Sequence, residues 1–253
     1  MTEPRVALVV GASRGVGLAL TELLLRRDDV DRVVATAREP ESSASLRALA
    51  QREPDRLLTA PLDVTDESSL EAAAARIGSW SGPTLHWLVN CAGLLHAGSE
   101  LRPEKKLEDV SPEALRAVFE VNAFGPLLLA KHFLRFLRHG DRAVFASLSA
   151  RMGSIGDNRL GGWYAYRASK SAQNMFLRTL SIECRRRAPN VLCLALHPGT
   201  VETELSEPYR GGVPAERLFS PSRAAEQLLD VIDASTPDDH GAFLAWDGTP
   251  IPW

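Results

Sequence analysis

The sequence is poor in cysteine, with three among its 253 residues. Cys91, Cys184 and Cys193 lie in or beside apolar stretches, and their spacing matches no metal-binding pattern. Scattered thiols of this kind are typical of reduced proteins, whereas small secreted folds use regularly spaced pairs. We therefore expect a cytoplasmic protein that has no disulfide framework and holds no metal ion.

Long apolar runs and a surplus of positive charge are also missing. No apolar stretch is long enough to cross a membrane, and no charged-then-apolar pattern of a secretory signal opens the chain. The formal net charge is −3, and the short cationic run Arg185–Arg187 suits the end of a helix, where positive charge is favoured. We expect neither a membrane nor a nucleic acid among its partners.

No shift in composition, internal repeat or low-complexity segment divides the chain. Its 45% hydrophobic and 24% charged residues are ordinary for a globular protein. A chain of this length can bury a large apolar core. We predict one domain that spans residues 1–253.

Apolar runs of strand length alternate with helical segments along the chain. The predicted strands are Val6–Val10, Arg32–Ala37, Leu57–Leu62, Leu85–Val89, Arg142–Leu148, Val191–Leu196 and Ala242–Trp246. Seven strands alternating with six helical segments predict an α/β fold, a parallel sheet covered by helices on both faces. Two helix starts are marked, because Ser111 and Ser220 each precede a proline and suit the N-cap position.

Two segments lack clear periodicity. Residues 94–110 follow the fourth predicted strand, and residues 202–219 follow the sixth. Both begin at the carboxyl end of a strand, where open α/β sheets bind ligands. We interpret the second as a mobile lid, because Pro208, Gly211, Gly212 and Pro214 interrupt it. A plain surface loop is the alternative for either segment.

A glycine-rich turn joins the first predicted strand to the first helix. Gly11, Gly15 and Gly17 follow Val6–Val10, and apolar residues at helical spacing follow them. Glycines let the backbone approach a pyrophosphate, and the helix N-terminus supplies free N–H groups. The turn predicts a dinucleotide site in a doubly wound Rossmann domain, and a tight strand–helix turn without a ligand is the alternative. No Gly-Lys-Ser/Thr follows, which argues against a nucleoside triphosphate P-loop.

Tyr166 and Lys170 stand four residues apart, which places them on one face of a helix. A free tyrosine has a pKa near ~10, and a neighbouring cation makes its phenol a usable acid or base near neutral pH. This spacing also occurs on ordinary solvated helices. Together with the glycine turn it predicts a catalytic pair.

These motifs and several others give the chain a resemblance to the classical short-chain dehydrogenase/reductases over nearly its whole length. The matching motifs, in order, are Gly11, Gly15 and Gly17; Asp63-Val64; Asn90-Cys91-Ala92-Gly93; Asn122 in Val121–Gly125; Tyr166 and Lys170; and Pro198–Thr203. The segment Gly153–Asn158 and the ending Trp246-Asp247-Gly248 are similar to the C-factor-like branch. The resemblance implies that residues 1–150, approximately, bind a nicotinamide cofactor and that the remainder carries the catalytic and substrate-binding groups.

The resemblance also implies roles for the catalytic residues. Tyr166 is the general acid in carbonyl reduction and the general base in alcohol oxidation. Lys170 lowers the pKa of Tyr166 and bonds the nicotinamide ribose. Asn122 holds a water that links Lys170 to solvent, and the alternative is that it closes a kink in a helix.

Three further polar residues have implied roles around the cofactor. Asn90 stabilises the central strands, Thr203 bonds the carboxamide or diphosphate, and Asp63 bonds the adenine amino group. The alternative for Asp63 is that it caps a turn before Thr65. The complete predicted cofactor set is Gly11, Ser13, Arg14, Gly15, Val16, Gly17, Arg38, Asp63, Val64, Asn90, Ala92, Gly93, Tyr166, Lys170, Pro198, Gly199, Val201 and Thr203.

The end of the second predicted strand favours NADP(H) over NAD(H). NAD-selective sites usually place an acidic residue there to bond the ribose 2′-hydroxyl. The segment here reads Ala35-Thr36-Ala37-Arg38, and Arg14 lies in the glycine turn. Two guanidinium groups suit a 2′-phosphate, although each arginine is also compatible with a solvent-exposed position.

The catalytic serine is where the chain departs from the family pattern. The family usually carries Ser-x-x-Gly after the fifth strand, but Ala150 stands three residues before Gly153. Ser149 is the nearest hydroxyl, and we predict that it orients the substrate carbonyl. Ser147 and Ser154 are the alternatives, and if none reaches the substrate the catalytic set is degraded.

The sequence predicts an NADP-dependent carbonyl reductase, or alcohol dehydrogenase, for a small and largely apolar substrate. A C-factor-type signalling protein with little turnover is the alternative. Trp163, Tyr164, Met152 and Leu205 are candidates for an apolar pocket or for ordinary packing. Helices around residues 112–138 and 165–187 often form an interface in relatives, and Met175 and Phe176 are compatible with a homodimer or homotetramer.

Overall fold

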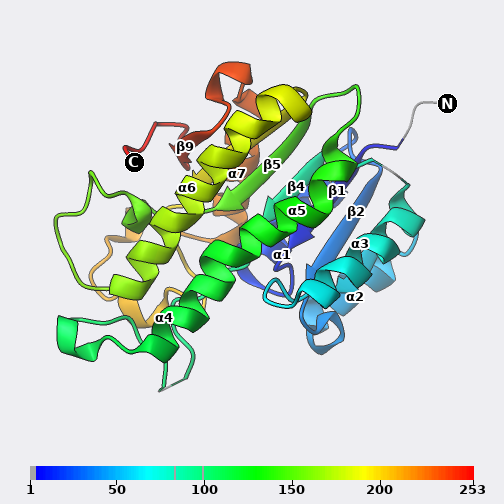
Figure 1. The fold of residues 1–253 in the computed structure, drawn as a ribbon. Coiled ribbons are helices and arrows are strands. Elements are labelled where there is room, and N and C mark those ends of the chain that lie inside the picture. The colour runs from blue at the N-terminus through cyan, green and yellow to red at the C-terminus, as the bar shows by residue number, and fades with distance from the viewer. Residues whose placement is uncertain (1–3, 83, 99) are drawn as a thin grey trace.

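The computed structural model describes residues 4–82, 84–98 and 100–253. Its main sheet has the strand order β3-β2-β1-β4-β5-β6-β9, and all neighbouring strands are parallel (Figure 1). The strands are β1 (Val6–Val10), β2 (Arg32–Ala37), β3 (Leu57–Pro61), β4 (Trp87–Asn90), β5 (Ala143–Leu148), β6 (Val191–His197) and β9 (Ala242–Ala245). The predicted seven-stranded parallel sheet is confirmed, with some ends shifted by one or two residues.

Helices cover both faces of the sheet (Figure 1). On one face lie α1 (Gly15–Leu25), α2 (Ala44–Arg52) and α7 (Pro221–Ala234), with a core that includes Leu20, Leu46 and Leu228. On the other lie α3 (Glu67–Ser81), α5 (Gly125–Leu137) and α6 (Tyr164–Arg187), with a core that includes Leu70, Phe133 and Leu177. Because both faces are covered, the central strands β1 and β5 are buried at every position, as their apolar sequences require.

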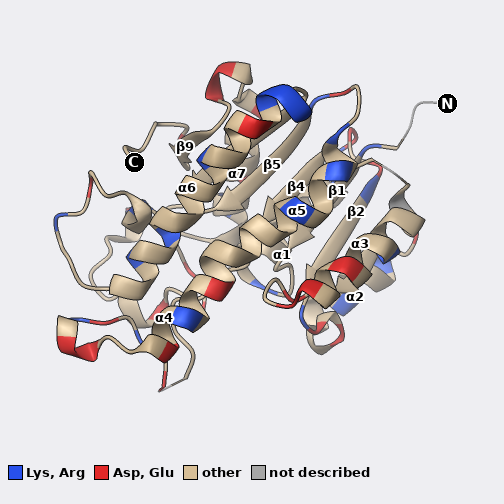
Figure 2. Cartoon of the chain, viewed as in Figure 1, with Lys and Arg blue, Asp and Glu red and all other residues tan. Residues whose placement is uncertain are grey.

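The helix ends follow the sequence signals. Ser111 Oγ accepts a hydrogen bond from Ala114 N at the start of α4 (Pro112–Phe119), and Ser220 Oγ accepts one from Arg223 N at the start of α7. Both predicted N-caps are therefore confirmed. Helix α6 ends at Arg187, so the cationic run Arg185–Arg187 lies at a helix C-terminus (Figure 2).

The segment after β6 is better ordered than its sequence suggests. The short strands β7 (Thr200–Val201) and β8 (Leu218–Phe219) pair in parallel at its two ends. Between them lie two 3₁₀ turns, Glu207–Tyr209 and Ala215–Arg217. The segment is thus tied at both ends, a geometry compatible with a lid; its mobility stays a prediction.

The strand order reverses between β1 and β4, because β2 and β3 extend the sheet on one side and β4 to β9 on the other. Such a switch point leaves a crevice at the carboxyl ends of the strands, where doubly wound folds bind ligands. The helices of the described residues include none that is both long and apolar enough to cross a membrane.

Candidate active site

A cavity of about 840 Å³ lies at the carboxyl ends of the strands. Its walls come from the glycine turn, the ends of β2 to β6, the start of α6 and the segment after β6. A volume of this size suits a cofactor and a small substrate together. The position matches the switch point of the sheet.

Most of the predicted site residues line this cavity. They are Gly11, Ser13, Arg14, Gly15, Val16, Gly17, Arg38, Asp63, Val64, Ala92, Gly93, Ser149, Tyr166, Lys170, Pro198, Gly199, Val201 and Thr203. Asn90 and Asn122 do not line it, although both are buried next to residues that do.

The glycine turn has the shape of a phosphate-binding cradle. A Cβ atom on Gly17 would lie 2.2 Å from the carbonyl oxygen of Gly11, so no larger residue fits there. Gly15 has a φ of +56°, and a Cβ atom at this position would lie 3.1 Å from Thr203 Cγ2. The turn also opens the N-terminus of α1, whose free N–H groups favour an anion. These features fit the pyrophosphate of a dinucleotide.

The two arginines at the adenosine end of the cavity differ in their surroundings. Arg38 is exposed and makes no ion pair or hydrogen bond with the residues that the structure describes. Arg14 Nη1 lies 2.7 Å from Glu204 Oε2, and both side chains are largely exposed. Arg38 is therefore free to meet a phosphate, whereas Arg14 would have to share its charge with Glu204.

Asp63 is engaged in a local turn. Its Oδ1 accepts hydrogen bonds from Thr65 N at 2.9 Å and Thr65 Oγ1 at 2.8 Å. This is the turn-capping geometry that the sequence left open as an alternative. The same carboxylate lines the cavity, so a contact with an adenine stays a prediction.

Tyr166 is buried at the start of α6 within a small apolar cluster. Leu95 and Ala150 complete the buried part of this cluster, and Met152, Trp163 and Tyr209 pack against it. The methyl group of Ala150 thus packs in the phenol's cluster, at the position where the family pattern has a serine hydroxyl. Burial raises the pKa of Tyr166, so the phenol is neutral across the physiological pH range.

Lys170 follows Tyr166 by one helical turn and is also buried. Its Nζ donates hydrogen bonds to Leu148 O at 2.8 Å and to Gln173 Oε1 at 2.9 Å, and it lies 5.9 Å from the centre of the Tyr166 ring. Burial lowers the pKa of Lys170 to about 7, while Cys91 acts in the opposite direction. The pKa of Tyr166 is raised by burial in this structure, which is the reverse of the lowering expected from Lys170.

Asn122 lies in a π-helical turn, Glu120–Phe124, that joins α4 to α5. Pro126 has no N–H group to donate to the Asn122 carbonyl four residues earlier, which accounts for the break in the α-helix. The side-chain amide donates to Leu94 O and accepts from Leu94 N, both at 2.7 Å, and Nδ2 also reaches Ser169 Oγ. Asn122 therefore clamps the loop after β4 to the irregular turn, as in the alternative interpretation of the sequence; its water-holding role stays a prediction.

The three candidate serines have different partners. Ser149 Oγ donates to Asn174 Oδ1 at 2.7 Å, and Ser149 is the candidate serine that lines the cavity. Ser147 Oγ accepts from Asn90 Nδ2 and from Gln173 Nε2, both at 2.9 Å. This contact links β4 to β5, as expected of a strand-stabilising Asn90.

Ser154 is the third candidate, and it too is buried away from the cavity lining. Its Oγ accepts from Asp157 N in the loop that precedes α6. Ser147 and Ser154 thus have structural partners. Ser149 keeps the predicted position in the cavity, with its proton directed to Asn174.

Two aromatic side chains, Trp163 and Tyr209, form a wall of the same cavity. Trp163, at a left-handed φ of 53°, packs edge-on against Tyr209 with ring centres 5.0 Å apart and against Tyr166 at 6.1 Å. Glu104 stabilises the backbone at Trp163 and at the start of α6. Its carbonyl oxygen accepts a hydrogen bond from Trp163 N, and its buried carboxylate accepts one from Ala165 N. Of the predicted pocket residues, Trp163, Met152 and Leu205 line the cavity, whereas Tyr164 is exposed.

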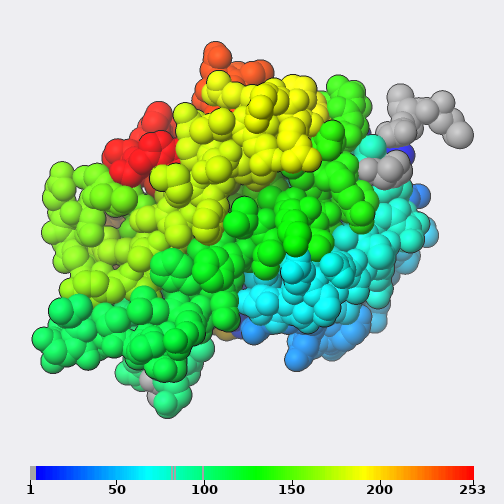
Figure 3. Space-filling view, viewed as in Figure 1, coloured from blue at the N-terminus to red at the C-terminus, as the bar shows by residue number. Residues whose placement is uncertain are grey.

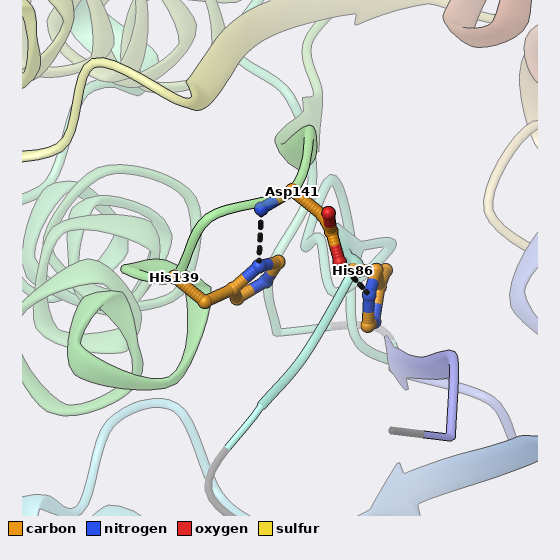
Figure 4. Close-up of side chains that lie close together, drawn as sticks. All are labelled: His86, His139 and Asp141. Carbon is orange, nitrogen blue, oxygen red and sulfur yellow. Dashed lines mark hydrogen bonds and ion pairs between the residues drawn. The ribbon is translucent and has the colours of Figure 1, made fainter. Parts of the chain in front are cut away.

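A cluster of His86, His139 and Asp141 lies at the opposite, amino-terminal end of the strands (Figure 4). His139 Nε2 lies 2.8 Å from Leu85 O, and His139 Nδ1 accepts from Asp141 N. His86 Nδ1 accepts from Val6 N, and its Nε2 lies 3.9 Å from Asp141 Oδ2. Because the backbone already uses both nitrogens of His139 and one of His86, this cluster fastens the α5–β5 connection rather than offering free metal ligands.

Several residues that line the cavity or support its walls lie outside the predicted set. Tyr209 and the buried Glu104 come from aperiodic segments, where no spacing predicts which side chain faces inward. His197, just before Pro198, also lines the cavity. Burial, and to a smaller extent the positive charge of Arg151, lowers the pKa of His197 to about 4, so this side chain is neutral at pH 7. Gln173 and Asn174 stand three and four residues after Lys170, and this helical spacing could have identified both.

Comparison with known proteins assigns the family. The model of the short chain dehydrogenase family matches residues 5–213. The chain is 31% identical to 1-hydroxy-2-glutathionyl-2-methyl-3-butene dehydrogenase of Rhodococcus sp. (strain AD45), covering 97% of this chain and 98% of that protein. It is 37% identical over 147 residues to C-signal of Myxococcus xanthus, covering 58% of this chain and 83% of that protein. The crystal structure of NADPH-bound carbonyl reductase from chicken fatty liver superposes with a TM-score of 0.87 at 32% identity, covering 100% of both chains.

Proposed function

The chain belongs to the short chain dehydrogenase family, and we propose that it is an NADP(H)-dependent oxidoreductase that interconverts a carbonyl group and an alcohol on a small, largely apolar substrate. The observation that supports this most strongly is the position of Tyr166 and Lys170, buried on one face of α6 beside a cavity that also contains the glycine cradle. We keep the interpretation of one domain whose first part, to about residue 150, binds the cofactor.

The reaction divides between the cofactor and two side chains. When bound, a nicotinamide cofactor would supply the hydride for the carbonyl carbon. Tyr166 donates its phenolic proton to the carbonyl oxygen, and the Lys170 ammonium stabilises the phenolate that remains until solvent returns a proton. The aromatic wall of Trp163 and Tyr209 excludes water and favours an uncharged, apolar substrate.

Ser149 is the proposed second donor to the substrate oxygen. Its single proton points at Asn174 Oδ1, while Asn174 Nδ2 is buried without a hydrogen-bond partner. Rotating the Asn174 amide by a half turn would let Nδ2 donate to Ser149 Oγ, and this would release the hydroxyl proton. The heavy atoms barely move in this exchange, so it costs little.

The cofactor preference should depend more on Arg38 than on Arg14. Arg38→Ala is expected to reduce the preference for NADPH over NADH by ~10-fold or more, because a charge-assisted contact with the 2′-phosphate is lost. Arg14→Ala should cost less, since Glu204 already neutralises much of its charge. Dissociation constants for both cofactors at one salt concentration measure this, and equal affinities in the wild type would contradict the proposal.

The direction of the reaction should depend on pH. Because burial raises the pKa of Tyr166, the phenol is protonated at neutral pH and is ready to act as an acid. Carbonyl reduction is therefore expected to proceed at pH 7, and alcohol oxidation, which needs the phenolate, should accelerate as pH rises. Initial rates of reduction and of oxidation, measured from about pH 6 to about pH 10, test this pH dependence. Oxidation that is fastest at the acid end would contradict it.

The function itself is tested by cofactor oxidation against a panel of aldehydes, ketones and quinones. We expect carbonyl-dependent loss of NADPH absorbance with at least one apolar member of the panel. Saturable NADPH binding with no turnover on any member would favour the second candidate.

The second candidate is a cofactor-binding signalling protein with little turnover. It is favoured by Ala150 in the place of the family serine and by the 37% identity to C-signal over part of the chain. The intact Tyr166–Lys170 pair argues against it, because signalling alone requires no buried proton donor beside the cofactor site.

We also propose that the protein forms a homodimer or homotetramer through α5 and α6. These helices lie side by side on one face of the molecule (Figure 3). Phe124 and Leu127 of the α5 region and Met175 and Ile182 of α6 are exposed hydrophobic residues, whereas Phe176 is half-buried. Its cytoplasmic location, expected from the unpaired cysteines, stays a prediction.

A further inference from the structure

One glutamine of α6 has a fully buried side chain that faces β5. Gln173 is 1% exposed, one helical turn after Lys170 and two after Tyr166. A buried primary amide is costly unless its donors and acceptor are satisfied. The partners of Gln173 therefore indicate why the fold keeps it there.

The hydrogen bonds fix the orientation of the Gln173 amide. Nε2 donates to Ser147 Oγ at 2.9 Å and to Leu148 O at 3.2 Å. Oε1 accepts from Lys170 Nζ at 2.9 Å. Because Leu148 O only accepts and the Lys170 ammonium only donates, turning the amide round would create two repulsive contacts.

The same arrangement leaves Lys170 with a defined geometry. An ammonium group has three N–H donors. Two of them point to Leu148 O and Gln173 Oε1, which lie on the β5 side of the helix. The third has no hydrogen-bond partner among the described residues. It is available to a cofactor ribose in the cavity that Lys170 and Tyr166 line.

We propose that Gln173 is a positioning residue that holds the Lys170 ammonium, in its charged form, beside Tyr166. This inference rests on the proposed oxidoreductase function, because it is in that reaction that the charge of Lys170 acts on the phenol.

The surroundings of Lys170 make this support necessary. The ionisable groups that face it are the Cys91 thiol after β4 and the Tyr166 phenol on its own helix. Burial raises the pKa of Cys91 to about 12 and also raises that of Tyr166, so both groups are neutral near pH 7. No carboxylate forms an ion pair with Lys170 within the described residues, and neutral carbonyl oxygens must stabilise its charge.

The chain is well suited to a direct test, because it has four lysines, Lys105, Lys106, Lys131 and Lys170. The first three are exposed, whereas Lys170 is buried, so its signal should behave differently from the other three. In protein labelled with ¹³C at the lysine ε carbon, the Lys170 signal should titrate near neutral pH and is assigned by its loss in Lys170→Ala. This measurement needs neither cofactor nor turnover.

Gln173→Leu is expected to lower the titration midpoint of Lys170 by about one pH unit, because one acceptor for the charged form is lost. Gln173→Met, which keeps the side-chain length, should do the same and serves if Gln173→Leu folds poorly. Ser147→Ala is the matched control, because it removes a hydrogen-bond partner of Gln173 Nε2 but keeps Gln173 Oε1, which accepts from Lys170. This variant should leave the titration midpoint of Lys170 unchanged. In carbonyl reduction, the pH above which the rate falls as Lys170 loses its charge should move down with the midpoint in both Gln173 variants.

An unchanged Lys170 midpoint in both Gln173 variants, or an equal shift in Ser147→Ala, would overturn the inference. Failure of the proposed function would give a different result. The wild-type protein would then reduce no carbonyl compound, independently of the Lys170 titration. The two failures are therefore separable in one set of samples.

Discussion

Tyr166→Phe is expected to lower carbonyl reduction by ~10³-fold or more while leaving the NADPH dissociation constant nearly unchanged. The substitution removes the phenolic proton that reaches the carbonyl oxygen, and general acid catalysis of this kind contributes ~10²–10⁴-fold. The ring itself stays in the cluster of Leu95 and Ala150, so the shape of the cavity is preserved. Steady-state rates and fluorescence titration with NADPH measure the two quantities.

Lys170→Ala provides the comparison for this result. It should weaken both turnover and cofactor binding, because the Lys170 ammonium is proposed to stabilise the phenolate and to reach the ribose. A Tyr166→Phe protein that keeps wild-type rates would remove Tyr166 from the mechanism. Equal loss of NADPH affinity in the two variants would mean that Tyr166 acts in binding rather than in proton transfer.

The second large effect is expected at the irregular serine. Ser149→Ala should lower the rate by ~10²-fold, comparable with removing one preorganised donor to a developing oxyanion. Ser147→Ala and Ser154→Ala should have much smaller effects on the rate, because the hydroxyls of both residues serve structural contacts. Rates measured at saturating NADPH compare the three variants.

Ala150→Ser decides where the second donor belongs. This substitution places a hydroxyl in the cluster that contains Tyr166. If Ser149 already serves as the donor, Ala150→Ser should change the rate little. A large gain in Ala150→Ser, combined with little loss in Ser149→Ala, would transfer the role to position 150 and mean that the native chain lacks its second donor.

The sequence predicts the fold well because the signals are local. Buried strands such as Val6–Val10 are continuous apolar runs, and Ser111 and Ser220 mark helix starts through contacts within a few residues. The glycine turn is predictable for the same reason, since Gly17 must be glycine to pass close to Gly11 O.

The site is predicted less completely, because its remaining features depend on contacts between distant segments. The carboxylate of Glu104 accepts a hydrogen bond from Ala165 N at the start of α6, 61 positions later in the sequence. Tyr209, in the segment after β6, packs against Trp163. The contact predicted between Arg14 and a phosphate stays a prediction, and the sequence does not reveal that Glu204 lies beside Arg14 in the folded chain. The pKa of Tyr166 likewise depends on how deeply the fold buries the phenol, which spacing from Lys170 does not reveal.

The central proposal is that this chain transfers hydride from NADPH to a carbonyl carbon with Tyr166 as the proton donor. The most direct measurement uses NADPH deuterated at the nicotinamide C4 position and follows the label into product by mass spectrometry and NMR. We expect deuterium on the carbinol carbon in the wild-type reaction and almost none with Tyr166→Phe over the same time. Tight binding of the labelled cofactor without deuterium in any product, across the carbonyl panel, would contradict the proposal.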